Sequence, residues 1–132
     1  MTQSPSTGGS ATIAAGLDWT NREAAATIPR SQPLTLRWSG ATREQVYVVG
    51  FSANDAKGAS GVFVCTADAA VGQITVPAYV LGSLPASSKI GGQAFGGLML
   101  GELFPQGEIG ADGIAKAVLL SIAASGREAP FE

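Results

Sequence analysis

The stretch that decides the fold class of this chain is Pro33-Leu34-Thr35-Leu36-Arg37-Trp38-Ser39-Gly40. Its apolar residues Leu34, Leu36 and Trp38 occupy every second position, with polar residues between them. Successive side chains of a strand point to opposite faces, so the pattern predicts one buried face and one solvated face. Pro33 and Gly40 bracket the stretch as turn residues. The stretch therefore predicts an antiparallel all-β domain with Trp38 in its core.

Further strand-like segments recur at short intervals along the chain. They cover residues 17–20, 34–38, 45–51, 61–66, 73–76 and 97–104. The segment 45–51 is apolar on both faces, which predicts a central strand that is covered on both sides. Short helical turns are expected at residues 21–26, with Asn21 as the cap, and at residues 78–84. The glycine-rich stretch 91–97 is interpreted as a flexible turn.

The segment 114–124 fits two structures. Its apolar residues recur at every fourth position, and Asp112 and Gly126 are suited to begin and end a helix. The same residues also alternate as a strand. The steady spacing of short strands elsewhere favours the closing strand of a sandwich. The strands are therefore expected to form an antiparallel all-β sandwich with one or two short helical turns.

Length and composition set further bounds. At 132 residues the chain is expected to form a single domain over residues 13–132, preceded by a flexible lead-in over residues 1–12. Charged residues make up 14% of the chain, against roughly 25% in typical soluble domains. The net charge is −2 and no basic run exists, so nucleic acid is not an expected partner. No apolar run is long enough for a membrane span.

The inventory of reactive side chains excludes several classes of enzyme. The chain has no histidine, which excludes Ser-His-Asp and Cys-His catalysis and zinc sites with histidine ligands. The single cysteine, Cys65, forms no intrachain disulfide and lies in an apolar run, where a free thiol is expected to pack as a small hydrophobe. No phosphate-binding loop is present. We expect no cofactor and no catalytic residue.

Carboxylates are the remaining source of chemistry. Glu102, Glu108, Asp55 and Asp68 are the acids from which a glycosidase pair would have to come. Residues 107–114 resemble one degenerate copy of a calcium-binding nonapeptide, with Asp112, Glu108 and Asp55 as candidate calcium ligands. A turn between two strands is the favoured interpretation of this segment.

Aromatic residues supply the candidates for ligand stacking. Trp38 is expected in the core, together with Leu34, Leu36, Val48 and Cys65. Trp19 and Tyr79 lie near the ends of their segments. They are therefore the candidates for exposed rings that stack on a sugar, although packing in the core or at its rim is the favoured interpretation of both.

The order of features between Trp19 and Pro85 points to a family. The features are Trp19-Thr20-Asn21, Ile28-Pro29-Arg30-Ser31, Leu34 to Gly40, Val46 to Ser52, Gly61 to Cys65, Ile74 to Pro77 and Val80 to Pro85. This order resembles an immunoglobulin-like module near the C-terminal end of large exported, uncharacterised proteins of soil bacteria. The resemblance covers about half of the chain. It implies an immunoglobulin-like antiparallel β-sandwich of about seven strands with one or two short helical turns, an extracellular setting and no known catalytic residue. The chain departs from antibody domains because it lacks the cysteine pair around Trp38.

These observations lead to a functional expectation. We expect a non-catalytic structural or adhesive module of an exported bacterial protein, secreted or at the cell surface as part of a longer chain. Its partners would be proteins or further copies of itself, with self-assembly through sheet edges as one mode. The alternative is a carbohydrate-binding module that binds a glycan with exposed aromatic residues. A carboxylate-based hydrolase ranks third.

Overall fold

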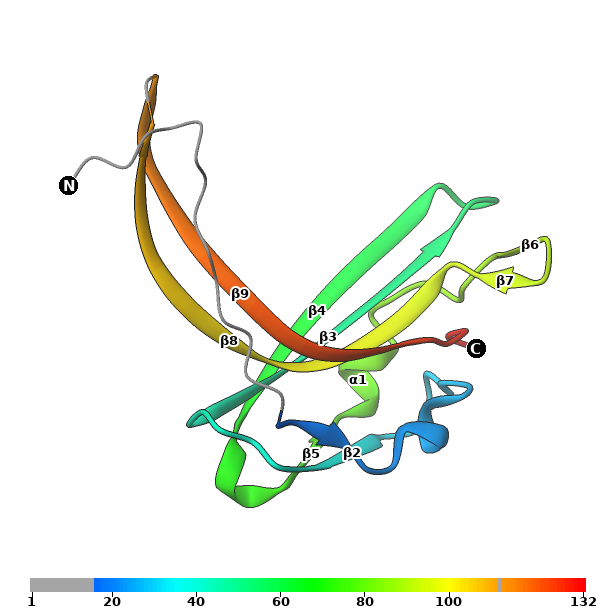
Figure 1. Cartoon of the computed structure of the whole chain (residues 1–132). Coiled ribbons are helices and arrows are strands. Elements are labelled where there is room, and N and C mark those ends of the chain that lie inside the picture. The colour runs from blue at the N-terminus through cyan, green and yellow to red at the C-terminus, as the bar shows by residue number, and fades with distance from the viewer. Residues whose placement is uncertain (1–15, 112) are drawn as a thin grey trace.

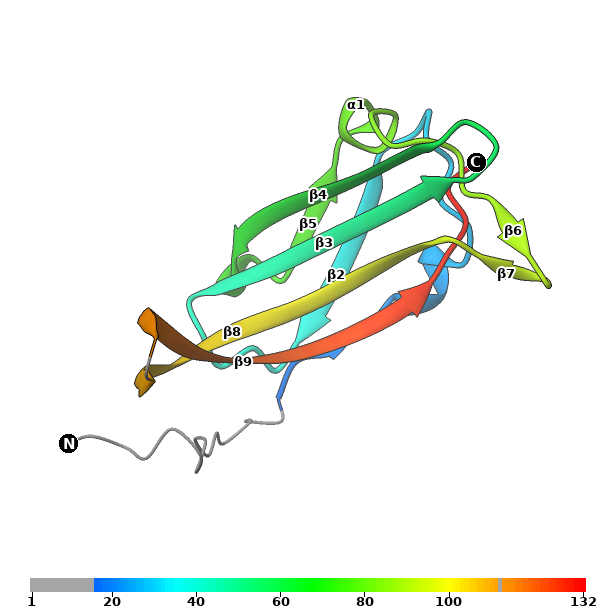
Figure 2. The same cartoon turned by 90° about the horizontal axis from the view of Figure 1, so that it is seen from above.

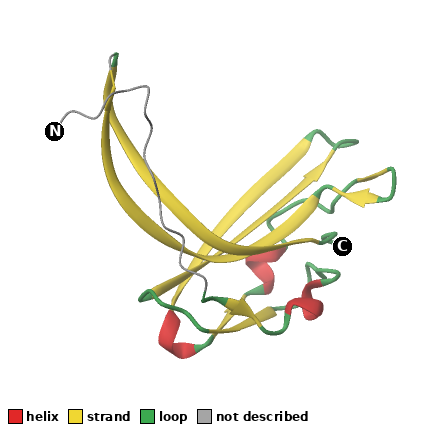
Figure 3. Ribbon diagram, viewed as in Figure 1, coloured by secondary structure: helices red, strands yellow, loops and turns green. Residues whose placement is uncertain are grey.

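A computed structural model describes residues 16–111 and 113–132. Strands make up most of this part of the chain (Figure 3). The strands are β1 (Asp18–Trp19), β2 (Leu34–Ser39), β3 (Gln45–Asn54), β4 (Ala59–Asp68), β5 (Gln73–Val76), β6 (Lys89–Ile90), β7 (Gln93–Ala94), β8 (Gly96–Ala111) and β9 (Ile114–Glu128). One short helix, α1 (Ala78–Leu81), and two 3₁₀ turns, η1 (Arg22–Ala25) and η2 (Ala69–Val71), connect them. The chain is an all-β protein, as the alternating stretch predicts.

The strands form two main antiparallel sheets and a small hairpin. The first sheet has the order β1-β2-β5, and the second has the order β4-β3-β8-β9. In Figures 1 and 2 the four-stranded sheet lies across the three-stranded sheet. The hairpin β6-β7 stands apart and turns through two glycines with positive φ, Gly91 at 60° and Gly92 at 83°. Residues 91–97, expected to be a flexible turn, thus contain a defined hairpin turn and the start of β8.

The core lies between the two main sheets. Leu34, Leu36 and Trp38 of β2 are buried, so the face assigned to them from the alternation is the face that packs inward. The four-stranded sheet contributes the buried residues Val46, Val48, Phe63, Leu98 and Leu100. The indole N–H of Trp38 donates to the carbonyl of Ala69 at 3.0 Å, which satisfies its buried polar atom. Cys65 is partly buried and packs against this core.

The side chain of Asn21 joins the first two strands. Its Oδ1 accepts the indole N–H of Trp19 at 3.1 Å and the backbone N–H of Arg37 at 2.8 Å. Its Nδ2 donates to the carbonyl of Thr35 at 2.8 Å. The helical turn expected here is present as η1, and Asn21 occupies its N-cap position, but its side chain does not cap the turn. The amide makes no cap hydrogen bond because its donor and acceptor are both used by neighbouring strands.

Residues 130–132 pack against Ile28 and place Phe131 in the core. The backbone N–H of Ile28 donates to the carbonyl of Pro130, and the N–H of Glu132 donates to the carbonyl of Ile28, both at 2.9 Å. Phe131 between them is 1% exposed. The hydroxyl of Ser87 accepts the N–H of Phe131 at 2.9 Å. The last residues are therefore part of the domain.

The β8-β9 hairpin extends well past the rest of its sheet (Figure 1). β3 pairs with β8 only from Gly96 to Gly101, and beyond that point β8 pairs with β9 alone. The segment 114–124 is thus a strand, which confirms the favoured interpretation over the helical one. Residues 107–111, the start of the supposed calcium repeat, belong to β8. We refer to residues 102–123 as the arm.

The fold contains more strands than the sequence predicts. The described residues form nine strands against an expectation of about seven, the additions being mainly the short β6 and β7. Among the described residues, no helix has the length and apolar character needed to cross a membrane.

Candidate functional site

The structure does not bring the candidate carboxylates together. Glu102 is 1% exposed and faces the core, where it accepts backbone hydrogen bonds. Asp55 follows the end of β3, while Asp68 ends β4 and pairs with Gln45 at the start of β3. At about 3.3 Å per residue, the ten-residue strands separate these two acids by roughly 30 Å. That separation is too large for the 5 to 10 Å, roughly, that a glycosidase pair requires. The side chain of Glu108 lies outside the described residues.

The described candidate calcium ligands do not form a metal site either. In the described part of the chain, no group of three or more histidine, cysteine or acidic residues is arranged to hold a metal ion. Asp55 lies in the exposed β3-β4 turn, and its backbone N–H donates to the hydroxyl of Ser88 at 2.8 Å. Asp112 lies outside the described residues. Nothing in the described geometry therefore selects Asp55 as a ligand.

The two aromatic candidates for ligand stacking have opposite environments. Trp19 is 5% exposed and belongs to the core, as the favoured interpretation predicts, so its ring is not available for stacking on a sugar. Its position next to a strand end suggested exposure, but pairing with Trp38 across β1 and β2 buries it. Tyr79 on α1 is 80% exposed. Phe51 and Phe95, which were not singled out, are also exposed.

The largest feature that sequence reasoning missed is the solvent-facing side of the four-stranded sheet. We define the outer face as the outward-pointing apolar residues of β3, β4 and β8: Tyr47, Val49, Phe51, Val62, Val64 and Met99. Val62 and Val64 are 67% and 60% exposed. The face is continuous, because these residues belong to adjacent strands in register.

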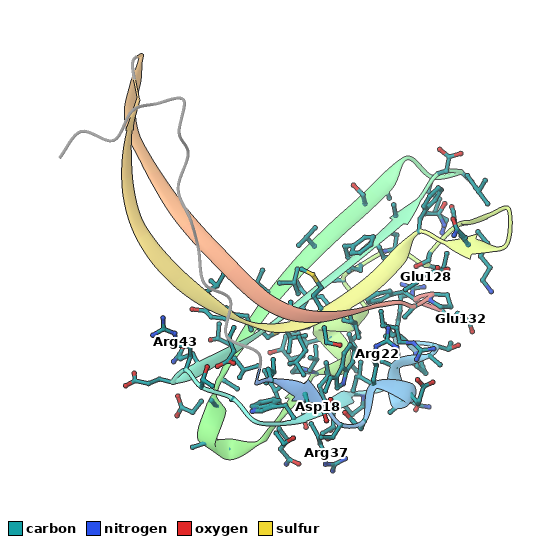
Figure 4. The ribbon with its side chains drawn as sticks, viewed as in Figure 1. Asp18, Arg22, Arg37, Arg43, Glu128 and Glu132 are labelled. Carbon is teal, nitrogen blue, oxygen red and sulfur yellow. The ribbon has the colours of Figure 1, made fainter. Side chains whose placement is uncertain are left out.

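Cross-strand pairing determines the shape of the outer face. Val64, Val49, Met99 and Gly126 form one row across all four strands, and the next row runs from Val62 through Phe51 to Gly97. A shallow apolar groove of about 280 Å³ lies next to Met99 and Val64 and extends to Gly101. Charged side chains labelled in Figure 4, such as Asp18, Arg22 and Arg37, belong instead to β1, η1 and β2.

The outer face corrects one prediction. The segment 45–51 does form a central strand, but within the described chain no element covers its second face, and Phe51 is 48% exposed. The sequence signal was present, since both 45–51 and 61–66 are apolar on both faces. A strand that is apolar on both faces ordinarily predicts that both faces are buried within one chain. The structure places the second apolar face in solvent instead.

A second open feature is the edge of the same sheet formed by β4. β4 pairs with β3 along its whole length without a bulge. Among the described residues, no hydrogen bond from any other element reaches β4. It carries no proline and no lysine, and its only charge is Asp68 at its end. Long, uncharged edges of this kind are the ones that accept another strand.

The single thiol lies on the core side of β4. Burial raises the pKa of Cys65 above its ordinary value. A nucleophilic cysteine needs a lowered pKa, so this environment is that of a packing residue.

The chain was compared with known protein families, curated proteins and solved structures. No protein-family model, no curated protein and no solved structure matches the chain.

Proposed function

We propose that this chain is a non-catalytic structural or adhesive module of an exported bacterial protein that acts through protein contacts made by its four-stranded sheet. The observation that carries the proposal is the outer face, on which Val62, Val64 and Phe51 are about half exposed or more. Contiguous apolar patches of this kind on soluble proteins mark interaction sites. In the described part of the chain, the arm also has backbone on both of its sides with no third strand beside it.

The strand order supports the immunoglobulin-like class within this proposal. In immunoglobulin nomenclature, β1-β2-β5 corresponds to strands A-B-E, and β4-β3-β8-β9 corresponds to C′-C-F-G. The core tryptophan Trp38 lies on the second strand of this order, whereas antibody domains carry theirs on strand C. The extracellular setting rests on the resemblance given above and on the low content of charged residues.

Sedimentation velocity over a wide concentration range tests the proposal. We expect the protein to self-associate, and the double variant Phe51→Ser, Met99→Ser to associate at least tenfold more weakly. Val71→Ser is the matched control, because Val71 is 64% exposed but lies on η2, away from the outer face. A wild-type protein that stays monomeric at millimolar concentration would contradict the proposal, and so would equal association of both variants.

The alternative function, glycan binding, rests on Tyr79. Its 80% exposed ring offers a stacking surface, although α1 holds no other aromatic residue beside it. A glycan array answers the question directly. Binding that is lost in Tyr79→Ala but kept in Val71→Ser would favour this alternative over a purely protein-binding module.

A further inference from the structure

We propose that β4 pairs antiparallel with β4 of a second copy, about a two-fold axis that passes beside Phe63. The pairing would join two four-stranded sheets into one and make their outer faces continuous. This inference rests on the proposed function, since it names the partner and the edge through which the module assembles. The inference also specifies which residues of the two β4 strands lie opposite each other.

Outside the arm, whose backbone also lacks a third strand, β4 is the described edge strand without protection. β1 has two residues, and β5 has four and is followed by Pro77. At the other edge of the large sheet, β9, the guanidinium of Arg22 donates to the carbonyl of Gly126 at 2.6 Å. Short edges, lysines, prolines and capped carbonyls all hinder the addition of a strand. β4 has ten residues and none of these features.

The backbone of β3 shows which groups of β4 face outward. The N–H of Ala53 donates to the carbonyl of Phe95 at 2.8 Å, and its carbonyl accepts the N–H of Ser88 at 2.9 Å. Ala53 thus directs its backbone away from β4. Because this direction alternates along a strand, Gly50 and Ser52 bond to Phe63 and Gly61 of β4. The alternation leaves the N–H and C=O groups of the even-numbered residues of β4 at the free edge.

Even-numbered residues must therefore pair with even-numbered residues across the new interface. An axis beside Phe63 places Val62 opposite Val64 of the second copy, and Ser60 opposite Thr66 of the second copy. Pairs of β-branched residues and pairs of hydroxyl residues are both favourable across antiparallel strands. All four side chains are exposed in the single chain and share the outer side of the sheet.

Charge complementarity favours this register over an axis at Val64. With the axis beside Phe63, Asp68 lies opposite Gly58 of the second copy and therefore next to Lys57 of the second copy. The same contact repeats at the other end of the interface by symmetry. Asp68 and Lys57 are both exposed. An axis shifted to Val64 would instead place Asp68 opposite Ser60, farther from the lysine. An axis at Val62 would place Asp68 opposite Ala56, which is also beside Lys57, but it would pair Val64 with Ser60 and so lose the matched pairs of valines and of hydroxyl residues.

Disulfide trapping tests the register. In a Cys65→Ser background, one batch of protein carries Val62→Cys and a second carries Val64→Cys. Opposed residues of a hydrogen-bonded antiparallel pair have Cα atoms about 5.5 Å apart, within the roughly 4.4 to 6.8 Å that a disulfide accepts. Diagonal neighbours are about 7 to 8 Å apart, which is beyond the limit. We expect mild oxidation of the mixture to give mixed dimers at least fivefold faster than either batch gives dimers alone.

Two other trapping results would overturn the register. Faster cross-linking of Val62→Cys alone would place the axis at residue 62, and faster cross-linking of Val64→Cys alone would place it at residue 64. Equal, slow cross-linking in all three samples would mean that the β4 edges do not meet.

A proline at the edge tests the pairing without a cysteine. The N–H of Val64 points to the free edge, so Val64→Pro removes a donor to the second copy and no bond to β3. Val64→Thr is the matched control, because it keeps the donor and the β-branched shape. We expect Val64→Pro to weaken self-association at least tenfold and Val64→Thr to change it less than threefold, with circular dichroism showing that both variants fold.

The results separate this inference from the function on which it rests. If Val64→Pro associates like the wild type while Phe51→Ser, Met99→Ser does not, the β4 pairing is wrong and the outer face still carries the function. If the wild type does not associate at all, both proposals fail.

Discussion

The carboxylate of Glu102 accepts the backbone N–H of Arg43 at 2.6 Å. The same oxygen accepts the N–H of Thr42 at 3.0 Å. Glu102 lies directly after Gly101, the last residue of β8 that pairs with β3. One buried side chain therefore joins the base of the arm to the connection between β2 and β3, which passes from one sheet to the other. The contact anchors the arm to the body of the domain.

Replacement of Glu102 is expected to destabilise the protein. Glu102→Ala removes the carboxylate that accepts both N–H groups, which should lower the free energy of unfolding by about 2 to 3 kcal/mol. Glu102→Gln keeps one acceptor oxygen but loses the negative charge, so a smaller loss of about 1 kcal/mol is expected. Urea unfolding measures the free energy of unfolding of both variants. Glu44→Gln, at an exposed position in the same connection, is the control. Equal stability of all three variants would mean that the carboxylate does not anchor the arm.

Gly50 and Phe63 are expected to be energetically coupled. They are opposed across β3 and β4, and a Cβ atom at position 50 would overlap the edge of the Phe63 ring. Gly50→Ala should therefore cost about 1 to 3 kcal/mol, since the ring cannot move without disturbing the core. Gly126→Ala, where a Cβ atom would meet Met99 at 3.4 Å, is the control and should cost far less.

A double-mutant cycle checks the cause of that loss. Phe63→Leu shortens the side chain and makes room for a methyl group at position 50. Gly50→Ala should then cost at least 1 kcal/mol less, roughly, in the Phe63→Leu background than in the wild type. Strictly additive losses would show that the glycine is needed for a different reason.

Asn21 is expected to resist conservative substitution. Asn21→Asp keeps the acceptor for Trp19 and Arg37 but places a carboxylate oxygen against the carbonyl of Thr35. Two facing acceptors repel, so a loss of about 1 to 3 kcal/mol is expected in thermal or urea unfolding at neutral pH. Thr20→Ala, at the exposed neighbouring position, should change stability by less than about 0.5 kcal/mol. A stable Asn21→Asp protein would contradict the role assigned to the amide.

The sequence predicts where the strands of this fold lie better than it predicts the contacts between them. Alternation in 34–38 and 73–76 is a local signal, and it identified β2 and β5 with nearly correct limits. The sequence leaves Trp19 as a candidate for exposure because its burial depends on Trp38, which lies nineteen residues away across β1 and β2. The roles of Glu102 and Asn21 depend on backbone groups of other strands, which no pattern within one segment reveals. The outer face had a signal, the two-sided apolar pattern of 45–51 and 61–66. The sequence of one chain does not show whether such a face is covered by other residues of that chain or by a partner.

The last prediction concerns the thiol of Cys65. Because burial raises its pKa, a larger share of the thiol is protonated at neutral pH than in the unfolded chain. Alkylation by iodoacetamide at pH 7.5 should therefore be at least tenfold slower in the folded protein than in guanidinium chloride. The thiol is neutral when protonated, so its contribution to stability is complete below the unfolded pKa and is lost as the pH rises through the folded one. The alkylation rate of the folded protein should accordingly keep rising with pH after that of the unfolded protein has levelled off. Equal rates in both states at pH 7.5 would mean that Cys65 is exposed and not a packing residue.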